Sequence, residues 1–182
     1  MAEQKKFGVS NCPPELAEKW IAVCDEKGYV KPTTYQGLYN MICRETEAAL
    51  LPLLRRHGMS FVAYSPLAAG FLTAKATTGQ AGGTRFDPAH PLSAAITARY
   101  GKPQYHGAVE ALLAALEPHG ITPGEAALRW ICYHSALGEG DGIILGASRI
   151  EQVRQNAADI EKGALPEAVV KEIEELWRTL SQ

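Results

Sequence analysis

The sequence predicts an α/β fold in which short parallel strands alternate with helices. Four short apolar runs recur along the chain, at residues 7–10, 33–36, 61–64 and 142–145, and helical patterns separate them. Each run ends in polar residues or glycine, as at the strand ends where ligands bind in parallel α/β folds. Strands that alternate with helices imply a parallel sheet with right-handed crossovers. This pattern does not distinguish half of a closed barrel from a small open sheet.

The helices are predicted from apolar periodicity and from residues that begin or end helices. Pro14 and Glu15 are typical of a first helical turn, and Gly28 is typical of a helix end. The apolar stripe of this helix is expected to comprise Leu16, Trp20, Ile21 and Cys24. Further helices are expected at residues 45–57, 107–118, 122–134, 150–159 and 166–180. Thr122 and Glu125 have the spacing of a capping box at the start of one of them.

A stretch rich in glycine and proline separates the third apolar run from the helix expected at residue 107. It extends over about residues 65–103, and segments of this length are commonly lids or disordered loops. The whole chain, residues 1–182, is expected to form one domain that contains this long loop.

Composition excludes several classes of protein. The chain has 182 residues and a formal net charge of −2, without the basic excess of a nucleic-acid-binding groove. No segment approaches the roughly 18 apolar residues of a membrane span, and residues 1–6 lack the apolar run of a secretory signal. The cysteines are widely spaced without a Cys-x-x-Cys pair, and no His/Glu spacing suggests a metal site. A reducing, cytoplasmic setting is therefore expected, with no metal.

Polar side chains end three of the predicted strands. Ser10 and Asn11 close the first, and their hydroxyl and amide suit a carboxamide ligand. Gln36 ends the second and supplies another amide, and Tyr64 ends the third with a ring that can stack on a flat heterocycle. Ordinary turns, helix caps and core tyrosines produce the same pattern, so the residues alone leave both interpretations open.

A second group of candidates suits an anion. Gly146 and Ser148 follow the fourth strand and precede a helix, whose N-terminal N–H groups bind anions. Gln152, Gln155 and Asn156 lie one and two turns further on, where a helix that faces solvent carries similar residues. In the long loop, the Gly/Ala turn at residues 68–70 allows close backbone approach to a diphosphate. Lys75 and Arg85 lie in the same loop. We expect them either to reach a phosphate or simply to be solvated.

The order and spacing of these motifs resemble the cofactor-binding half of an aldo-keto reductase, over about residues 7–180. The aflatoxin-aldehyde-reductase-like branch matches best. Its motifs are Tyr-Gln-Gly-x-Tyr-Asn at 35–40, Pro-Leu-Ala-x-Gly-x-Leu-Thr at 66–73, Ala-Ala-Leu-Arg-Trp at 126–130 and Ile-Leu-Gly-x-Ser…Gln-x-x-Gln-Asn at 144–156. The resemblance implies a (β/α)8 barrel fold, here as a half barrel of about four parallel strands with helices.

The resemblance also assigns roles toward NADPH. Ser10, Asn11 and Gln36 would hold the nicotinamide carboxamide, and Tyr64 would pack on its ring. The loop from Ser65 to Lys75, with Leu67, and also Arg85 would contact the diphosphate. The segment from Gly146 to Asn156 would hold the adenosine and its 2′-phosphate, through Ser148, Gln152 and Asn156 foremost and Gln155 beside them.

The activity implied is NADPH-dependent reduction of a small aldehyde or ketone to an alcohol, in detoxification or secondary metabolism. The family's catalytic Asp, Tyr, Lys and His lie on the first four βα units, which have no counterpart in this sequence, so no catalytic residue is assigned. Autonomous catalysis is therefore not expected. The alternatives are an inactive nucleotide-binding or scaffold half barrel, or a truncated gene model. Because a half barrel leaves two unpaired edges, self-association or pairing with another half barrel is expected.

Overall fold

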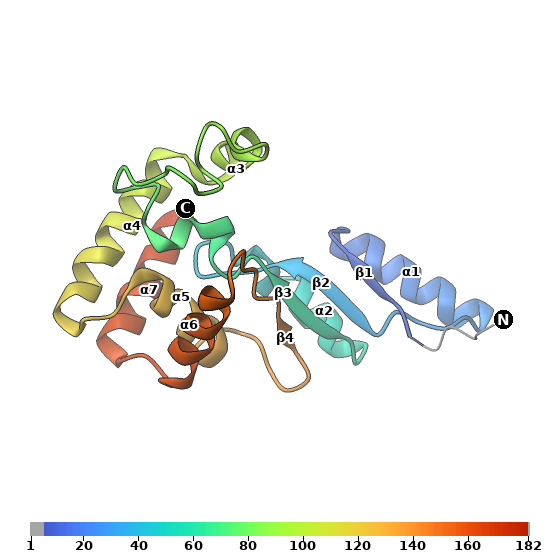
Figure 1. The fold of residues 1–182 in the computed structure, drawn as a ribbon. Helices are drawn as coiled ribbons and strands as arrows, with labels where there is room; N and C mark the ends of the chain where they lie inside the picture. The colour runs from blue at the N-terminus through green and yellow to red at the C-terminus, as the bar shows by residue number, and fades with distance from the viewer. Residues whose placement is uncertain (1–5, 182) are drawn as a thin grey trace. The chain divides into compact units, whose positions relative to one another are not determined.

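A computed structural model describes residues 6–181, and the four strands in this range form one parallel sheet (Figure 1). The strands are β1 (Gly8–Ser10), β2 (Thr34–Leu38), β3 (Ser60–Tyr64) and β4 (Gly142–Ile143). They are ordered β1-β2-β3-β4, so each strand pairs with its neighbour in sequence and helices connect successive strands. The predicted α/β class is confirmed, and the topology is that of a partial (β/α) barrel. β1 and β4 are the two edges of this sheet.

Except for the helix at residues 93–100, which lies in the stretch expected as a loop, the helices lie close to their predicted positions. They are α1 (Pro14–Lys27), α2 (Leu50–Arg56), α3 (Ser93–Tyr100), α4 (Pro103–Leu116), α5 (Pro123–Tyr133), α6 (Ile150–Glu161) and α7 (Glu167–Leu180), with the 3-10 segments η1 (Glu45–Glu47), η2 (Ala68–Thr73) and η3 (Glu117–His119). The predicted helix ends are confirmed at two places. Gly28 adopts a left-handed φ of 68° after α1, and the Thr122 hydroxyl accepts the N–H of Glu125 at the start of α5.

Three expectations differ from the structure. The helix expected at 45–57 is divided into η1 and α2. The stretch expected as a loop at 65–103 contains η2 and α3, because its alanines and Tyr100 form helical turns that composition alone did not reveal. On α1 the buried residues are Ala17 and Ile21, whereas Leu16 and Trp20 of the expected apolar stripe are exposed.

The described chain divides into two compact units. The first comprises the residues up to 39, residues 43–64 and residues 136–144, and therefore contains the sheet, α1 and α2. The second comprises residues 40–42, 65–135 and 145 onward, and contains the remaining helices. The chain passes from the first unit to the second directly after β3 and just beyond β4.

The sheet of the first unit has one buried and one open face. On the buried face, the rings of Tyr35 and Phe61 stack with centroids 6.0 Å apart. Gly37 makes room for this stack, because a Cβ there would lie 2.7 Å from the Phe61 ring. On the open face, register places Ser10 beside Gln36. This alternation follows from the period of two along a strand.

The second unit is a cluster of helices around its own apolar core. α4 and α7 lie side by side (Figure 1). The largest fully buried side chains of this unit are Met41, Phe71, Leu72, Leu112, Leu116, Leu128, Trp130 and Ile131. Phe71 of η2 packs against Tyr100 of α3 and His106 of α4, with ring centroids 5.9 and 5.1 Å away. The segment that follows β3 is thereby fixed to the helical cluster.

Candidate functional site

The structure brings the strand-end candidates of the first unit together on the open face of the sheet. Ser10 and Gln36 are paired in register, and both are exposed. Gln36 is paired in turn with Val62, two residues before Tyr64 and therefore on the same face. Because β2 continues to Leu38, Gln36 lies within the strand rather than at its end. The face thus presents a hydroxyl, an amide and an aromatic ring to one space.

Asn11 and Tyr64 are joined directly. The Tyr64 hydroxyl donates to Asn11 Oδ1 over 2.9 Å, across 53 residues of sequence. Asn11 has a φ of 54°, a left-handed conformation that non-glycine residues seldom adopt. The Tyr35 hydroxyl fixes the next residue by donating to the Cys12 carbonyl over 2.7 Å, and burial, followed by the nearby Cys12, raises the pKa of Tyr35 to about 12. The phenol therefore stays protonated and holds this turn in place.

Tyr39 and Asn40, which directly follow β2, have supporting roles that the sequence did not predict. Tyr39 is fully buried, and its hydroxyl donates to Glu47 Oε1 over 2.6 Å and accepts the N–H of Ala136. Asn40 is fully buried in the second unit, where its amide donates to the Ser65 carbonyl over 3.0 Å and its Oδ1 accepts the N–H of Ile42. Asn40 therefore positions the first residue of the segment expected at the diphosphate.

That segment contains most of the left-handed backbone among non-glycine residues of the described chain. Ser65, Ala68, Ala69 and Ala74 have φ values of 56°, 49°, 59° and 65°. Such conformations typically cost about 1–3 kcal/mol each and cluster at ligand-binding turns. The Leu67 carbonyl accepts the N–H groups of Gly70 and Leu72, which closes the turn. The observed strain supports a functional role for this turn.

The start of α6 is organised by the side chain of Gln152. Its Oε1 accepts the Ser148 N–H at 2.8 Å, the Ser148 hydroxyl at 3.1 Å and the Arg149 N–H at 3.2 Å. Gly146, Ser148 and Gln152 are exposed, and a Cβ on Gly146 would meet no other atom within 4 Å. The N–H groups of Ser148 and Arg149, which are expected to bind an anion, thus donate to the neutral carboxamide oxygen of Gln152. Both residues are exposed.

Gln155 and Asn156, the other candidates on α6, have surroundings that differ from those of Gln152. The Gln155 amide donates to Asp159 Oδ1 over 2.9 Å, and Asn156 is half-buried. Asp159 belongs to a network that joins α6 to α5: Lys162 Nζ contacts both Asp159 and Glu125, and Arg129 Nη1 donates to Glu125 over 2.7 Å. Gln155 therefore participates in the network that fixes the helix, a contribution the sequence analysis did not foresee.

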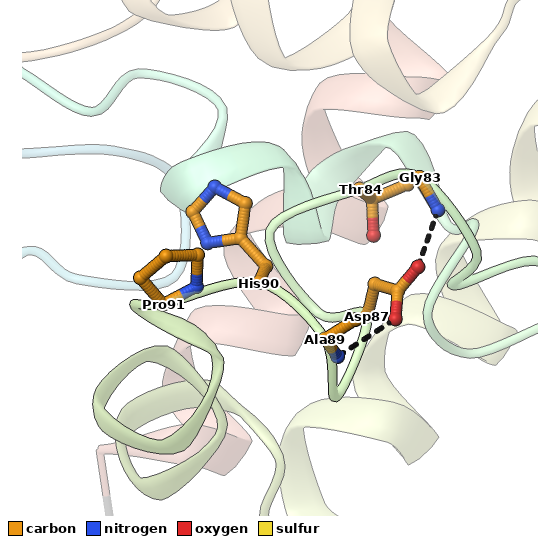
Figure 2. A pocket seen from close by; sticks show the side chains of 6 residues that line it. All are labelled: Gly83, Thr84, Asp87, Ala89, His90 and Pro91. Atoms are coloured by element: carbon orange, nitrogen blue, oxygen red, sulfur yellow. Dashed lines mark hydrogen bonds between the residues drawn. The ribbon is translucent and has the colours of Figure 1, made fainter.

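The two loop cations are exposed, and the loop around Arg85 forms a separate hollow. Figure 2 shows it: the Asp87 carboxylate accepts the N–H groups of Gly83 and Ala89, and these bonds, Gly83 first, lower the pKa of Asp87. The hollow measures about 250 Å³ and is lined by Gly83, Thr84, Asp87, Ala89, His90 and Pro91. Neither Lys75 nor Arg85 lines it. The Asp87 carboxylate already accepts two N–H groups of its own loop. We therefore interpret the hollow as part of the loop's own structure and not as a binding site.

Two kinds of feature are absent from residues 6–181. No group of three or more His, Cys, Asp or Glu side chains is arranged to hold a metal ion. None of the helices in the same range has the length and apolar character that crossing a bilayer requires.

The family of this chain follows from its similarity to known proteins. The model of the aldo/keto reductase family matches residues 4–178. The chain belongs to the aldo/keto reductase family. It is 41% identical over 175 residues to the oxidoreductase sirO of Leptosphaeria maculans, which covers 95% of this chain and 53% of that protein. It is 35% identical over 186 residues to human aflatoxin B1 aldehyde reductase member 2, covering 97% and 52% of the two chains.

A more distant relative is the aldo-keto reductase pigE of Monascus ruber, 29% identical over 177 residues, which cover 93% of this chain and 52% of that protein. The chain therefore spans about half the length of the aldo/keto reductases that it matches. The resemblance to the aflatoxin-aldehyde-reductase-like branch is confirmed, and the half-length match fits the partial barrel.

Proposed function

We propose that this chain supplies the NADPH-binding half of an oxidoreductase that reduces an aldehyde or ketone to an alcohol. The observation that carries the proposal is the open face of the first unit. Ser10, Gln36 and Tyr64 share that face, and Asn11 is hydrogen-bonded to Tyr64. Family membership supports oxidoreductase chemistry, and the name of the human relative specifies an aldehyde.

The residues present fit the nicotinamide end of such a cofactor. A carboxamide needs both hydrogen-bond donors and acceptors, which the side chains of Ser10, Asn11 and Gln36 provide. The Tyr64 ring, held by its bond to Asn11, would support one face of the nicotinamide. When bound, the cofactor supplies the hydride. This chain's own contribution is to hold and orient the ring.

The second unit fits the phosphate end. The Ser65–Lys75 segment, with Leu67, and Arg85 would contact the diphosphate. Gly146, Ser148, Gln152, Gln155 and Asn156 would bind the adenosine and its 2′-phosphate. A phosphate at the start of α6 would compete with the Gln152 oxygen for the N–H groups of Ser148 and Arg149, and the guanidinium of Arg149 adds positive charge beside it.

None of the residues proposed here to bind the cofactor corresponds to the family's catalytic Asp, Tyr, Lys and His, so they would not supply the proton required at the substrate oxygen. Removing a general acid commonly costs about 10²–10⁴-fold in rate. We therefore propose that these residues bind NADPH for the reduction of a small carbonyl compound of detoxification or secondary metabolism, together with a second half barrel. We place it in the cytoplasm, consistent with the free thiols of Cys12, Cys24 and Cys132.

An NADPH titration of the full chain, followed by cofactor fluorescence with NADH as control, tests this proposal. Saturable binding selective for NADPH is expected, and Gln36→Ala should weaken it. Gln80→Ala is the matched control, since Gln80 is an exposed glutamine for which only a backbone hydrogen bond is described. Absence of binding at millimolar cofactor would refute the proposal. Binding without turnover, even beside a complementary half barrel, would favour a nucleotide-binding or scaffold protein.

A further inference from the structure

The segment that follows β3, residues 65–77, is strained and is held at both of its ends. It contains η2 and lies wholly in the second unit. Ser65, Ala68, Ala69 and Ala74 have left-handed backbone conformations, which are unfavourable for residues with a Cβ. Such conformations persist only where the surrounding structure fixes them. The contacts that fix this segment therefore bear on its role.

Asn40 holds the first residue of the segment. Its side chain is fully buried, and its amide nitrogen donates to the Ser65 carbonyl over 3.0 Å. Its Oδ1 accepts the Ile42 N–H over 3.1 Å, which fixes the orientation of the amide. Because both polar atoms of this buried side chain are engaged, the Ser65 carbonyl is tied to a residue 25 positions away.

His106 of α4 holds the other end. Its Nδ1 lies 3.0 Å from the Thr77 hydroxyl, in a hydrogen bond in which either group can donate. Its ring packs edge-on against Phe71, with the ring centroids 5.1 Å apart. One imidazole thus contacts the middle of the segment through its ring and the end of the segment through a hydrogen bond.

The middle of the segment is anchored as firmly as its ends. The side chains of Ala68, Phe71 and Leu72 are fully buried. A segment that becomes ordered only around a ligand is expected to have few buried apolar contacts. Lys75, in contrast, is exposed and lies two residues before Thr77. The chain's own contacts therefore fix the backbone while the Lys75 side chain stays accessible to an anion.

We propose that Asn40 and His106 are positioning residues that hold residues 65–77 in the conformation that receives the cofactor diphosphate, before the cofactor binds. The inference rests on the proposed function, because it takes the diphosphate as the ligand of this segment. Neither side chain contacts the cofactor. Their contribution is preorganisation: a segment that is already ordered loses less conformational entropy on binding. Loss of either contact therefore lowers the affinity for NADPH without removing any contact to it.

Limited proteolysis with trypsin measures the order of the segment without any ligand. Lys75 and Arg149 are both exposed and both belong to the second unit, so cleavage after Lys75 is measured relative to cleavage after Arg149. Asn40→Ala and Thr77→Val should each raise this ratio by about twofold to tenfold, the factor expected when one hydrogen bond is lost. General destabilisation of the unit would speed both cleavages and leave the ratio unchanged.

Matched variants isolate the contact between His106 and Thr77. His106→Phe keeps an aromatic ring against Phe71 and removes the hydrogen bond, so it should raise the cleavage ratio as Thr77→Val does. The double variant should raise the ratio no further, because both changes remove the same bond. Thr179→Val is the control, since the Thr179 hydroxyl donates to the Glu175 carbonyl within α7. Circular dichroism checks that each variant folds.

Titration of the same variants with two ligands tests whether this order serves the cofactor. The dissociation constant for NADPH should rise by about twofold to tenfold in Asn40→Ala and in Thr77→Val. The dissociation constant for 2′-AMP, which has the adenosine and the 2′-phosphate but no diphosphate, should not change. A purely structural role would weaken the binding of both ligands or of neither.

Two results would overturn the inference. One is a cleavage ratio in the folded variants that equals the ratio in the unaltered chain. The other is a raised ratio with unchanged affinity for NADPH, which would mean that the order of this segment does not serve the cofactor. Failure of the unaltered chain to bind NADPH would instead refute the proposed function, and the cleavage ratios would still decide whether Asn40 and His106 order the segment.

Discussion

Trp130 of the second unit and Trp20 of the first unit differ in burial. In the second unit Trp130 is fully buried in the core, whereas Trp20 in the first unit is 42% exposed beside β1, one edge of which has no partner strand in residues 6–181. The second unit encloses its own core and holds its α6 segment through a buried polar network. The first unit presents one open sheet face, two sheet edges and an apolar groove lined in part by Trp20. Burial thus separates residues that stabilise this chain from residues available to bind something else.

The largest expected effect on the free energy of unfolding comes from replacing Trp130 of the second unit by alanine. The same replacement of Trp20 in the first unit is the comparison. Trp130→Ala should lower the free energy of unfolding by about 3–5 kcal/mol, because it leaves a cavity where a fully buried ring was. Trp20→Ala should lower it by less, about 1–2 kcal/mol, since Trp20 is 42% exposed and its truncation removes less buried apolar area. Urea denaturation followed by far-UV circular dichroism measures both. Equal effects would contradict the distinction between a closed core and an uncovered surface.

A second contrast concerns two ion pairs with the same spacing. In the second unit, Arg129 and Glu125 are about nine-tenths buried, and Arg129 also donates to the carbonyls of Gly163 and Ala164. Arg129→Met should cost about 3 kcal/mol, because the Glu125 carboxylate stays buried with Lys162 as its remaining cationic partner.

The matched control for this pair is Lys171→Met, whose partner Glu167 lies on the same helix four residues away. Both side chains are largely exposed, at 73% and 83%. Exposed pairs contribute little, so the loss should not exceed about 0.5 kcal/mol. Thermal unfolding of the two variants is the measurement. A similar loss in both would mean that the buried network does not fix α6.

Much of this fold was accessible from local sequence patterns. Strands and helix ends were found because alternation, apolar runs and residues such as Gly28 act over a few neighbours. Local patterns did not predict features that depend on contacts between residues far apart in the sequence. Trp20 was expected in the core because its spacing from Ile21 and Cys24 suits a helical stripe, yet it is 42% exposed in the structure of residues 6–181.

The candidate site shows the same limit. The sequence placed polar residues after strands, and parallel pairing then brought Ser10 beside Gln36. The sequence did not indicate that Asn40 holds the Ser65 carbonyl, or that Gln155 joins the Asp159 network, because both depend on contacts. The buried Arg129 was part of a family motif, but nothing local distinguished it from a surface arginine.

A smaller effect is expected in the sheet of the first unit. Gly37→Ala would bring a Cβ within 2.7 Å of Phe61 and 3.1 Å of Tyr35, so the buried stack must shift. Overpacking of this kind costs about 1–3 kcal/mol. Gly142→Ala in β4 is the control, because its Cβ would lie 3.8 Å from Val62, an ordinary contact. Chemical denaturation should separate the two variants, and equal tolerance would show that the Phe61 ring is free to move.

The smallest effect is a pH dependence that belongs to the second unit. Burial, and next the charge of Arg129, lowers the pKa of His134 below its usual 6.5, although Glu174 acts in the opposite direction. His134 Nε2 accepts the N–H of Leu165 over 2.8 Å, which requires an unprotonated nitrogen. Its position after α5 would otherwise favour a cation, so burial and the Arg129 charge outweigh the helix dipole.

The sign of the pH dependence follows from this lowered pKa. Below pH 6.5 the unfolded chain binds more protons at this residue than the folded chain, so stability falls as the pH drops through the folded-state pKa. The contribution of one such group is at most about 1.4 kcal/mol per pH unit. His134→Gln, whose amide oxygen can still accept from Leu165, should flatten the stability profile between pH 7 and pH 5. His119→Gln, at an exposed position, is the matched substitution. Denaturation midpoints measured across this range decide the matter, and an unaltered slope in His134→Gln would assign the pH dependence to other groups.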